Sequence, residues 1–153
     1  MIGTSKFPRS LLGLGIPLAL LLLASANLYA QQPMAISLSG DAEVPPVTTS
    51  AKGTVQITVQ PDRTVSGDIK TSGMIPTMAH IHEAAAGKNG PAIVTLTQTA
   101  DDSFAVPADA KLTDAQYGSY MNGNLYVNVH SAAYPNGEIR AQLPPGKPMI
   151  IAN

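Results

Sequence analysis

The sequence predicts an all-β fold, a Greek-key β-sandwich with one short inserted helix. Several short segments alternate apolar and polar residues with the period of two that is typical of half-buried strands. Turn residues separate these segments at regular intervals, and a single segment carries convincing signals of a helix start and stop. This combination indicates two packed sheets with the helix as an insertion between strands.

The first half of the domain begins with short strands. Residues 35–39 alternate apolar and polar side chains, and residues 53–60 do so most clearly. A Pro-Asp-Arg turn follows, and residues 64–71 are predicted to return as the second strand of a hairpin. The paired prolines at 45–46 cannot donate to a sheet, so we expect an extended edge or loop between the first two strands.

The second half predicts further strands and the inserted helix. Thr113 and Gln116 have the pattern of a capping box, Leu112 and Tyr117 can pack as a hydrophobic staple, and the Asn-Gly pair at 122–123 is a stop signal. A polar loop is expected at residues 101–103. The predicted strands of this half are residues 78–83, 92–97, 124–130 and 137–143.

The first thirty residues have the pattern of a cleaved secretory signal peptide. Lys6 and Arg9 form a positive segment, residues 11–24 are apolar without a charge, and small residues offer a cleavage site. The alternative is a single membrane anchor, although the apolar run is short for a span of about 20 residues. The signal predicts a secreted or periplasmic protein. The predicted organisation is a signal peptide at 1–30, one domain at 31–143 and a flexible C-terminal tail at 144–153.

Composition excludes several classes of function. Beyond residue 30, seven basic side chains face ten acidic ones, a net charge of −3, and no Lys/Arg cluster offers a nucleic-acid surface. The sequence has no Trp and few Phe, so platforms for stacking bases or sugars are poor. The absence of Cys means that the core rather than disulfides must hold the domain, and that any metal must bind without thiolate.

All three histidines lie in two of the predicted strands. His80 and His82 project from the same face of one strand, with Cβ atoms roughly 6.5–7 Å apart. His130 lies on the polar face of the strand at 124–130. If the two strands are antiparallel neighbours, three imidazoles converge on one patch. A lone histidine is more often a hydrogen-bonded structural residue, but this pattern makes His80, His82 and His130 candidate metal ligands.

The residue types of this patch point to copper, with zinc as the alternative. Three nitrogen ligands with an open position suit Cu(II) or Zn(II), and copper binds more tightly where both are available. Met78 shares the face of His80 and could add a thioether that favours Cu(I), although the alternative is a core side chain. Asn128 and Tyr126 share the face of His130 and could support or shield a ligand imidazole, unless they are ordinary residues of a wet strand face.

Five ordered motifs make the sequence resemble the CHRD domain, the module first described as a repeat in chordin. The resemblance implies an exported β-domain over residues 31–143, and in animals such domains occur in a protein that binds extracellular growth factors. The motifs are Glu-Val-Pro-Pro at 43–46, Ala-His-Ile-His at 79–82, Asn-Gly-Pro at 89–91, Leu-Tyr-Val-Asn-Val-His at 125–130 and Gly-Glu-Ile-Arg-Ala-Gln-Leu at 137–143.

The histidine strands are also similar to the copper half of a copper/zinc superoxide dismutase, in which a His-x-His strand and a later strand histidine hold the copper. This second resemblance implies an immunoglobulin-like or superoxide-dismutase-like sandwich. The sequence has no counterpart of the bridging histidine, the zinc ligands or the disulfide of that family, nor of its arginine beside the copper unless Arg140 reaches that place. It therefore implies a site more than a reaction.

The remaining polar residues of the motifs are predicted to be structural. Arg140 is expected to form an ion pair with Glu43 or Glu138 at the edge of the sandwich. No carboxylate pair, Ser-His-Asp order, phosphate loop or nucleotide motif indicates catalysis.

Three hypotheses of function follow from the sequence. The first is an exported protein that binds or handles copper through its histidines. The second is a superoxide-dismutase-like copper enzyme, and the third is a metal-free extracellular module that binds a protein or a polysaccharide. We expect metal binding without enzyme activity, no nucleic-acid partner, and no membrane span after signal cleavage.

Overall fold

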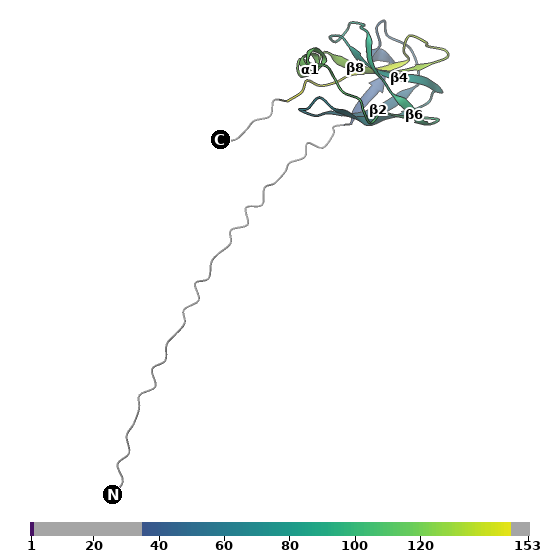
Figure 1. Cartoon of the computed structure of the whole chain (residues 1–153). Coiled ribbons are helices and arrows are strands. Elements are labelled where there is room, and N and C mark those ends of the chain that lie inside the picture. The colour runs from purple at the N-terminus through teal and green to yellow at the C-terminus, as the bar shows by residue number, and fades with distance from the viewer. Residues whose placement is uncertain (2–34, 148–153) are drawn as a thin grey trace. The chain divides into compact units, whose positions relative to one another are not determined.

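The computed structural model describes Met1 and residues 35–147. Apart from Met1, the predicted signal peptide lies outside the described residues, as does the end of the predicted tail at 148–153. The described residues form nine β-strands, one 3-10 helix and one α-helix (Figure 1). These are β1 (Ile36–Ser39), η1 (Gly40–Ala42), β2 (Lys52–Val59), β3 (Val65–Ser72), β4 (Pro76–Glu83), β5 (Ala92–Thr95), β6 (Thr97–Ala100), β7 (Ser103–Ala105), α1 (Asp114–Met121), β8 (Leu125–Ser131) and β9 (Ile139–Gln142).

The strands pair antiparallel in the order β5-β4-β8-β9-β1-β2-β3-β7-β6. A single residue pair, Ser39 with Arg140, joins β1 to β9, and the sheet turns there from one layer into the other. Figure 1 shows β4 and β8 in one layer and β2 and β6 in the other. The two edge strands, β5 and β6, are consecutive in the chain, so the sheet is nearly closed. The predicted all-β, sandwich-like fold is confirmed.

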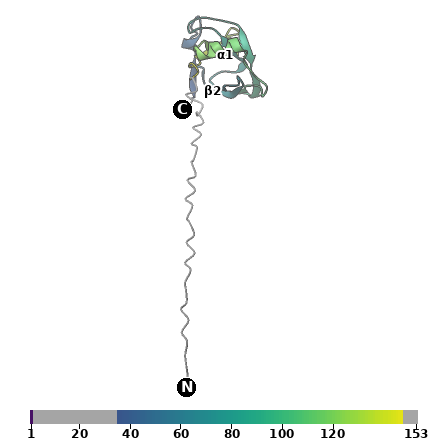
Figure 2. The same cartoon turned by 60° about the vertical axis from the view of Figure 1, so that its left-hand side comes forward.

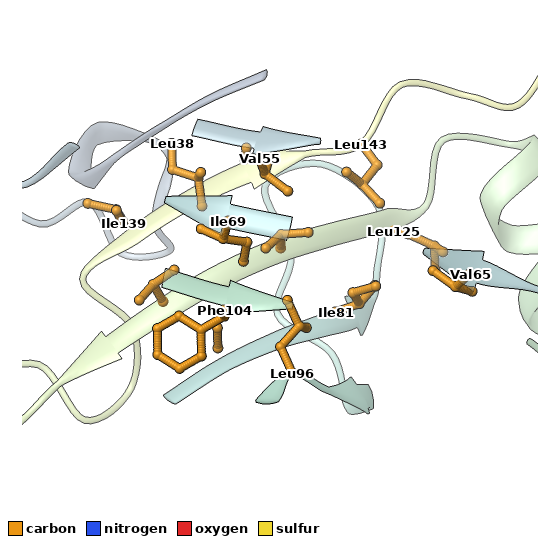
Figure 3. Packing of buried hydrophobic residues seen from close by; sticks show 14 of the residues in the cluster. Leu38, Val55, Val65, Ile69, Ile81, Leu96, Phe104, Leu125, Ile139 and Leu143 are labelled. Carbon is orange, nitrogen blue, oxygen red and sulfur yellow. The ribbon is translucent and has the colours of Figure 1, made fainter. Parts of the chain in front are cut away.

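The hydrophobic core lies between the two layers (Figure 3). In one layer, Ile36, Val55, Ile69 and Phe104 form a cross-strand row through β1, β2, β3 and β7. The facing layer presents a second row, Ala79, Val129 and Ile139, and a third, Ile81, Val127 and Ala141. Alternation along each strand therefore sends one set of side chains into the core and leaves the other set on the outer faces.

The predicted strand at 92–97 is two strands in the structure. The chain leaves β5 and enters β6 at Leu96, whose side chain is buried in the core and whose N–H donates to Ala79 O at 2.9 Å. The expected polar loop at 101–103 is a tight turn, after which β7 returns along β6 with Phe104 buried. A change of layer within one apolar run is not visible in its periodicity.

The inserted helix α1 has the predicted capping box. Gln116 N donates to Thr113 Oγ1 at 3.2 Å, and Thr113 N donates to Gln116 Oε1 at 2.9 Å. Figures 1 and 2 show α1 at one end of the layers rather than as a layer of its own. No helix among the described residues is long and apolar enough to cross a membrane.

The first residues of the predicted tail contact this helix. Gly146 N donates to Tyr120 O at 3.2 Å, and Pro145 packs over Gly123. Pro145 and Gly146 therefore contact the domain beyond Leu143, and the flexible tail expected at 144–153 stays a prediction.

Truncation of a core residue is expected to destabilise the fold, because it leaves a cavity between the layers. Leu38 is fully buried, and Leu38→Ala should lower the free energy of unfolding by about 2–5 kcal/mol. The control is Ile75→Ala, at a side chain that is 85% exposed, which should change it by less than about 0.5 kcal/mol. Denaturant unfolding measures both, and equal midpoints for the two variants would contradict this placement of the core.

Candidate metal centre

The two histidine strands are direct neighbours in the sheet. β4 and β8 pair antiparallel with Met78 opposite His130, His80 opposite Asn128 and His82 opposite Tyr126. The polar faces identified in the sequence therefore lie side by side on the outer face of this layer, away from the hydrophobic core. The register brings the side chains of His80, His82 and His130 together.

The three imidazoles are close enough for one ion after a small adjustment. His80 Nδ1 lies 3.0 Å from His130 Nε2, and one ligand nitrogen from each histidine lies within 4.8 Å of the others. Two nitrogens that are each about 2.0–2.1 Å from an ion are at most about 4.2 Å apart. A nitrogen pair 4.8 Å apart must therefore close by at least about 0.6 Å, and by more where the two ligands are not opposite one another on the ion.

Backbone carbonyls set the tautomers of two histidines. His82 Nδ1 lies 2.9 Å from Gly90 O, and His130 Nδ1 lies 2.9 Å from Pro135 O. A carbonyl oxygen can only accept, so each Nδ1 carries a hydrogen and each Nε2 keeps its lone pair. His82 Nε2 is buried without a hydrogen-bond partner. Donation from the other ring nitrogen to a carbonyl is the usual support of a metal-ligating histidine.

His80 is the most adaptable of the three. Its Nδ1 faces the lone pair of His130 Nε2, so without an ion it donates a hydrogen bond to that nitrogen. The ring is half-buried, so its hydrogen can move to Nε2 and free Nδ1 for a metal. Burial, and then the neighbouring His130 and His82, lower the pKa of His80, and burial lowers the pKa of His130 against the effect of its bond to Pro135 O. Both rings are therefore neutral near pH 7, as metal binding requires.

Tyr126 holds His82 in place. The two rings stack with centroids 4.7 Å apart and planes 9° apart. The Tyr126 hydroxyl accepts a hydrogen bond of 3.3 Å from Gly90 N, the residue whose carbonyl binds His82. Tyr126 thus covers one face of the His82 ring and also anchors the loop that carries Gly90 O, and its role as a shield of a metal ligand stays a prediction.

Asn128 and Met78 differ in part from their expected roles. Asn128 makes no hydrogen bond to a histidine; its amide lies beside Glu43, and its Oδ1 is buried without a partner. Met78 is 46% exposed and is absent from the core cluster, so the alternative of a core side chain is wrong. It is paired with His130 in the register of β4 and β8.

Arg140 has other partners than the predicted carboxylates. Among the described residues, no salt bridge joins Arg140 to Glu43 or Glu138. Glu138 instead accepts a hydrogen bond from Thr49 Oγ1 at 2.7 Å. Arg140 is 1% exposed, because its side chain lies beneath the loop between β4 and β5, and only its charge reaches Glu43.

The contacts of Arg140 organise that loop. Nη2 donates to Lys88 O at 2.9 Å and to Gln142 Oε1 at 3.3 Å, and Nη1 donates to Asn89 Oδ1 at 3.1 Å. Its guanidinium carbon lies 3.4 Å from the centroid of the Tyr126 ring. Arg140, Tyr126 and His82 therefore form one stack across β9, β8 and β4.

Sequence reasoning missed the carbonyls of Gly90 and Pro135, because a backbone group leaves no residue-type signal. The one sequence signal is that Gly90 belongs to the Asn-Gly pair at 89–90 and Pro135 precedes the Asn-Gly pair at 136–137, and such pairs are typical of turns. Both turns lie against the outer face of β8. Their carbonyl oxygens accept hydrogen bonds from His82 and His130.

Glu43 is buried near the site with an incomplete set of hydrogen bonds. It is 6% exposed, and its Oε1 has no partner. Gly137 packs so closely over it that a Cβ at this position, where φ is +127°, would lie 2.5 Å from Oε1. Burial raises the pKa of Glu43 to about 7, against the charge of Arg140, the backbone N–H of Val44 and the Asn128 amide, which lower it.

Stability is expected to depend on pH through Glu43. Its pKa rises on folding from 4.5 to about 7, so the folded state holds the proton more tightly and loses stability as pH rises through this interval. Glu43→Gln cannot ionise. Its free energy of unfolding relative to the original protein should rise between pH 4.5 and 7 by on the order of 2 kcal/mol and then level off. Urea unfolding at several pH values measures this difference, and a flat difference would contradict it.

The family comparison covers the region that holds this site. The model described as CHRD domain matches residues 34–143, which include all nine strands and the three histidines. No curated protein and no solved structure matches the chain. The likeness to the copper half of a superoxide dismutase therefore stays a prediction from the sequence.

Proposed function

The chain belongs to the CHRD domain family, and we propose that it binds one transition-metal ion, copper in preference to zinc, through His80, His82 and His130. The observation that carries the proposal is the buried, unpartnered Nε2 of His82. Its ring is fixed by Gly90 O on one side and by Tyr126 on its face, and it lies within reach of two further imidazole nitrogens.

The energetics favour an ion at this place. A buried acceptor without a partner costs about 1–3 kcal/mol, and rotation of a fixed ring cannot remove this cost. A metal at His82 Nε2 would replace the missing hydrogen bond with a coordinate bond. It would also replace the hydrogen bond between His80 and His130. For this, the hydrogen on His80 Nδ1 has to move to Nε2.

Donor chemistry supports copper. The described cluster contains imidazoles alone, without carboxylate or thiolate, and nitrogen-rich sites bind Cu(II) more tightly than Zn(II) where both are available. Metal binding or handling suits the site better than catalysis, because no carboxylate joins the cluster as a general base. We also propose export to the periplasm or the outside of the cell, on the signal-like pattern of residues 1–30.

A metal-free module for a protein or polysaccharide partner is the second candidate. It is favoured by the contact between His80 and His130, which lets these two rings satisfy one another without an ion. The superoxide-dismutase-like enzyme is a narrower form of the copper proposal, supported by the half-buried His80, which leaves one ligand accessible. Copper-loaded protein that turns over superoxide no faster than free copper would remove it.

Loss of one ligand is expected to abolish tight binding. Because outer supports of metal ligands already contribute about 10–100-fold in affinity, His82→Ala should lower the affinity for Cu(II) by more than about 100-fold. The same change also removes the hydrogen bond to Gly90 O and the stack on Tyr126, so denaturant unfolding of the metal-free variant must first show that it is folded. Calorimetric titration of protein without a histidine tag measures the affinity, and electron paramagnetic resonance identifies nitrogen ligands.

The control for this experiment is Gln98→Ala, an exposed side chain on β6 in the other layer, which should leave both measurements unchanged. Equal copper affinity in His82→Ala and the original protein would show that the site is assigned wrongly. Retention of partner binding after chelation would favour the metal-free module.

A further inference from the structure

Two features beside the histidines distinguish this site from a simple three-imidazole centre. One is the exposed thioether of Met78, and the other is the buried charge of Arg140 behind Tyr126. They lie at opposite ends of the patch and belong to different strands, β4 and β9. Both bear on the same property, the oxidation state of a bound copper ion.

Met78 is placed to reach an ion held by the histidines. It lies directly opposite His130 in the register of β4 and β8, so their Cβ atoms are about 4.5–5.5 Å apart. It is also two residues before His80, on the same face of the strand. Three rotatable bonds and the lack of core contacts leave its sulfur free to turn toward the site. A thioether is a soft ligand that selects Cu(I) over Zn(II).

Arg140 places a positive charge near the ligand His82. Only the ring of Tyr126 separates the guanidinium from the His82 imidazole, because β8 lies between β9 and β4. All three hydrogen-bond acceptors of Arg140 are neutral, namely Lys88 O, Asn89 Oδ1 and Gln142 Oε1. Its charge is therefore not cancelled by a contacting carboxylate. In a buried environment such a charge disfavours a divalent ion more than a monovalent one.

We propose that the centre selects Cu(I), with the Met78 thioether as a fourth ligand and the Arg140 charge raising the reduction potential of the bound copper. This inference rests on the proposed binding of metal by the three histidines. The ion that the protein handles is then a soft monovalent one. Arg140 acts on this ion through its charge, in place of the ion pair predicted from the sequence.

The first test compares Met78→Leu with its matched control, Met74→Leu. Met74 is partly buried and packs against the core, so the same substitution there tests for general effects. Met78→Leu should weaken Cu(I) binding about tenfold and leave Zn(II) binding within about twofold. Anaerobic competition of the protein with a coloured Cu(I) chelator measures the first affinity, and calorimetry measures the second.

A spectroscopic measurement separates ligation from a structural effect. X-ray absorption of the Cu(I)-loaded protein should show a sulfur neighbour that disappears in Met78→Leu and persists in Met74→Leu. The second variant, Arg140→Gln, keeps polar contacts while removing the charge. It should lower the reduction potential, by about 59 mV for each tenfold fall in the ratio of Cu(I) to Cu(II) affinity.

The outcomes distinguish this inference from the proposal on which it rests. Original protein that binds neither copper nor zinc at the histidines overturns both. Stoichiometric binding with an unchanged ratio of Cu(I) to Zn(II) affinity in Met78→Leu, and no sulfur neighbour, overturns the Cu(I) inference alone. If Arg140→Gln does not fold, the Met78→Leu comparison decides the inference by itself.

Discussion

Strand β8 is buried on both of its faces, and the arrangement around the histidines depends on that burial. All seven of its residues, from Leu125 to Ser131, are buried. One face packs in the hydrophobic core, whereas the other carries Tyr126, Asn128 and His130, which are buried as well, with the loops of Gly90 and Pro135 against them. Polar groups removed from water must find partners inside the protein, so these loops have to supply hydrogen bonds as well as cover.

Arg140 supplies several of these hydrogen bonds. Its guanidinium fixes the loop between β4 and β5 through two backbone or amide oxygens, and that loop in turn presents Gly90 O to His82. A second loop presents Pro135 O to His130. The remaining buried atoms without partners, Glu43 Oε1, His82 Nε2 and Asn128 Oδ1, all belong to residues of the same covered outer face. Buried polar atoms without partners, which cost stability, are therefore concentrated where the proposed chemistry is placed, as is common for functional sites.

Strand parity made much of the site predictable from the sequence. Alternation with a period of two placed Met78, His80 and His82 on one face and Tyr126, Asn128 and His130 on one face, and the structure has both. The pairing of β4 with β8 was not predictable, because 41 residues lie between Glu83 at the end of β4 and Leu125 at the start of β8, and periodicity carries no information on strand order.

The partners of Arg140 were not predictable either. A charged residue in a motif suggests an ion pair, yet the contacts of Arg140 include a backbone carbonyl and side-chain amides, which depend on how two distant loops fold over the sheet.

The division of residues 92–97 into β5 and β6 also depends on contacts between distant parts of the chain. The residues at both sides of Leu96 favour strands equally, and only the closure of the sandwich decides that the chain changes layers there.

The most direct test of the account is anomalous X-ray diffraction at the copper absorption edge from crystals of the copper-loaded protein. We expect a single strong peak bonded to His80 Nδ1, His82 Nε2 and His130 Nε2, with Gly90 O and Pro135 O still accepting from the other nitrogens of His82 and His130. A peak at another place, or no ordered peak and an intact contact between His80 and His130, would contradict the account and make the histidines structural.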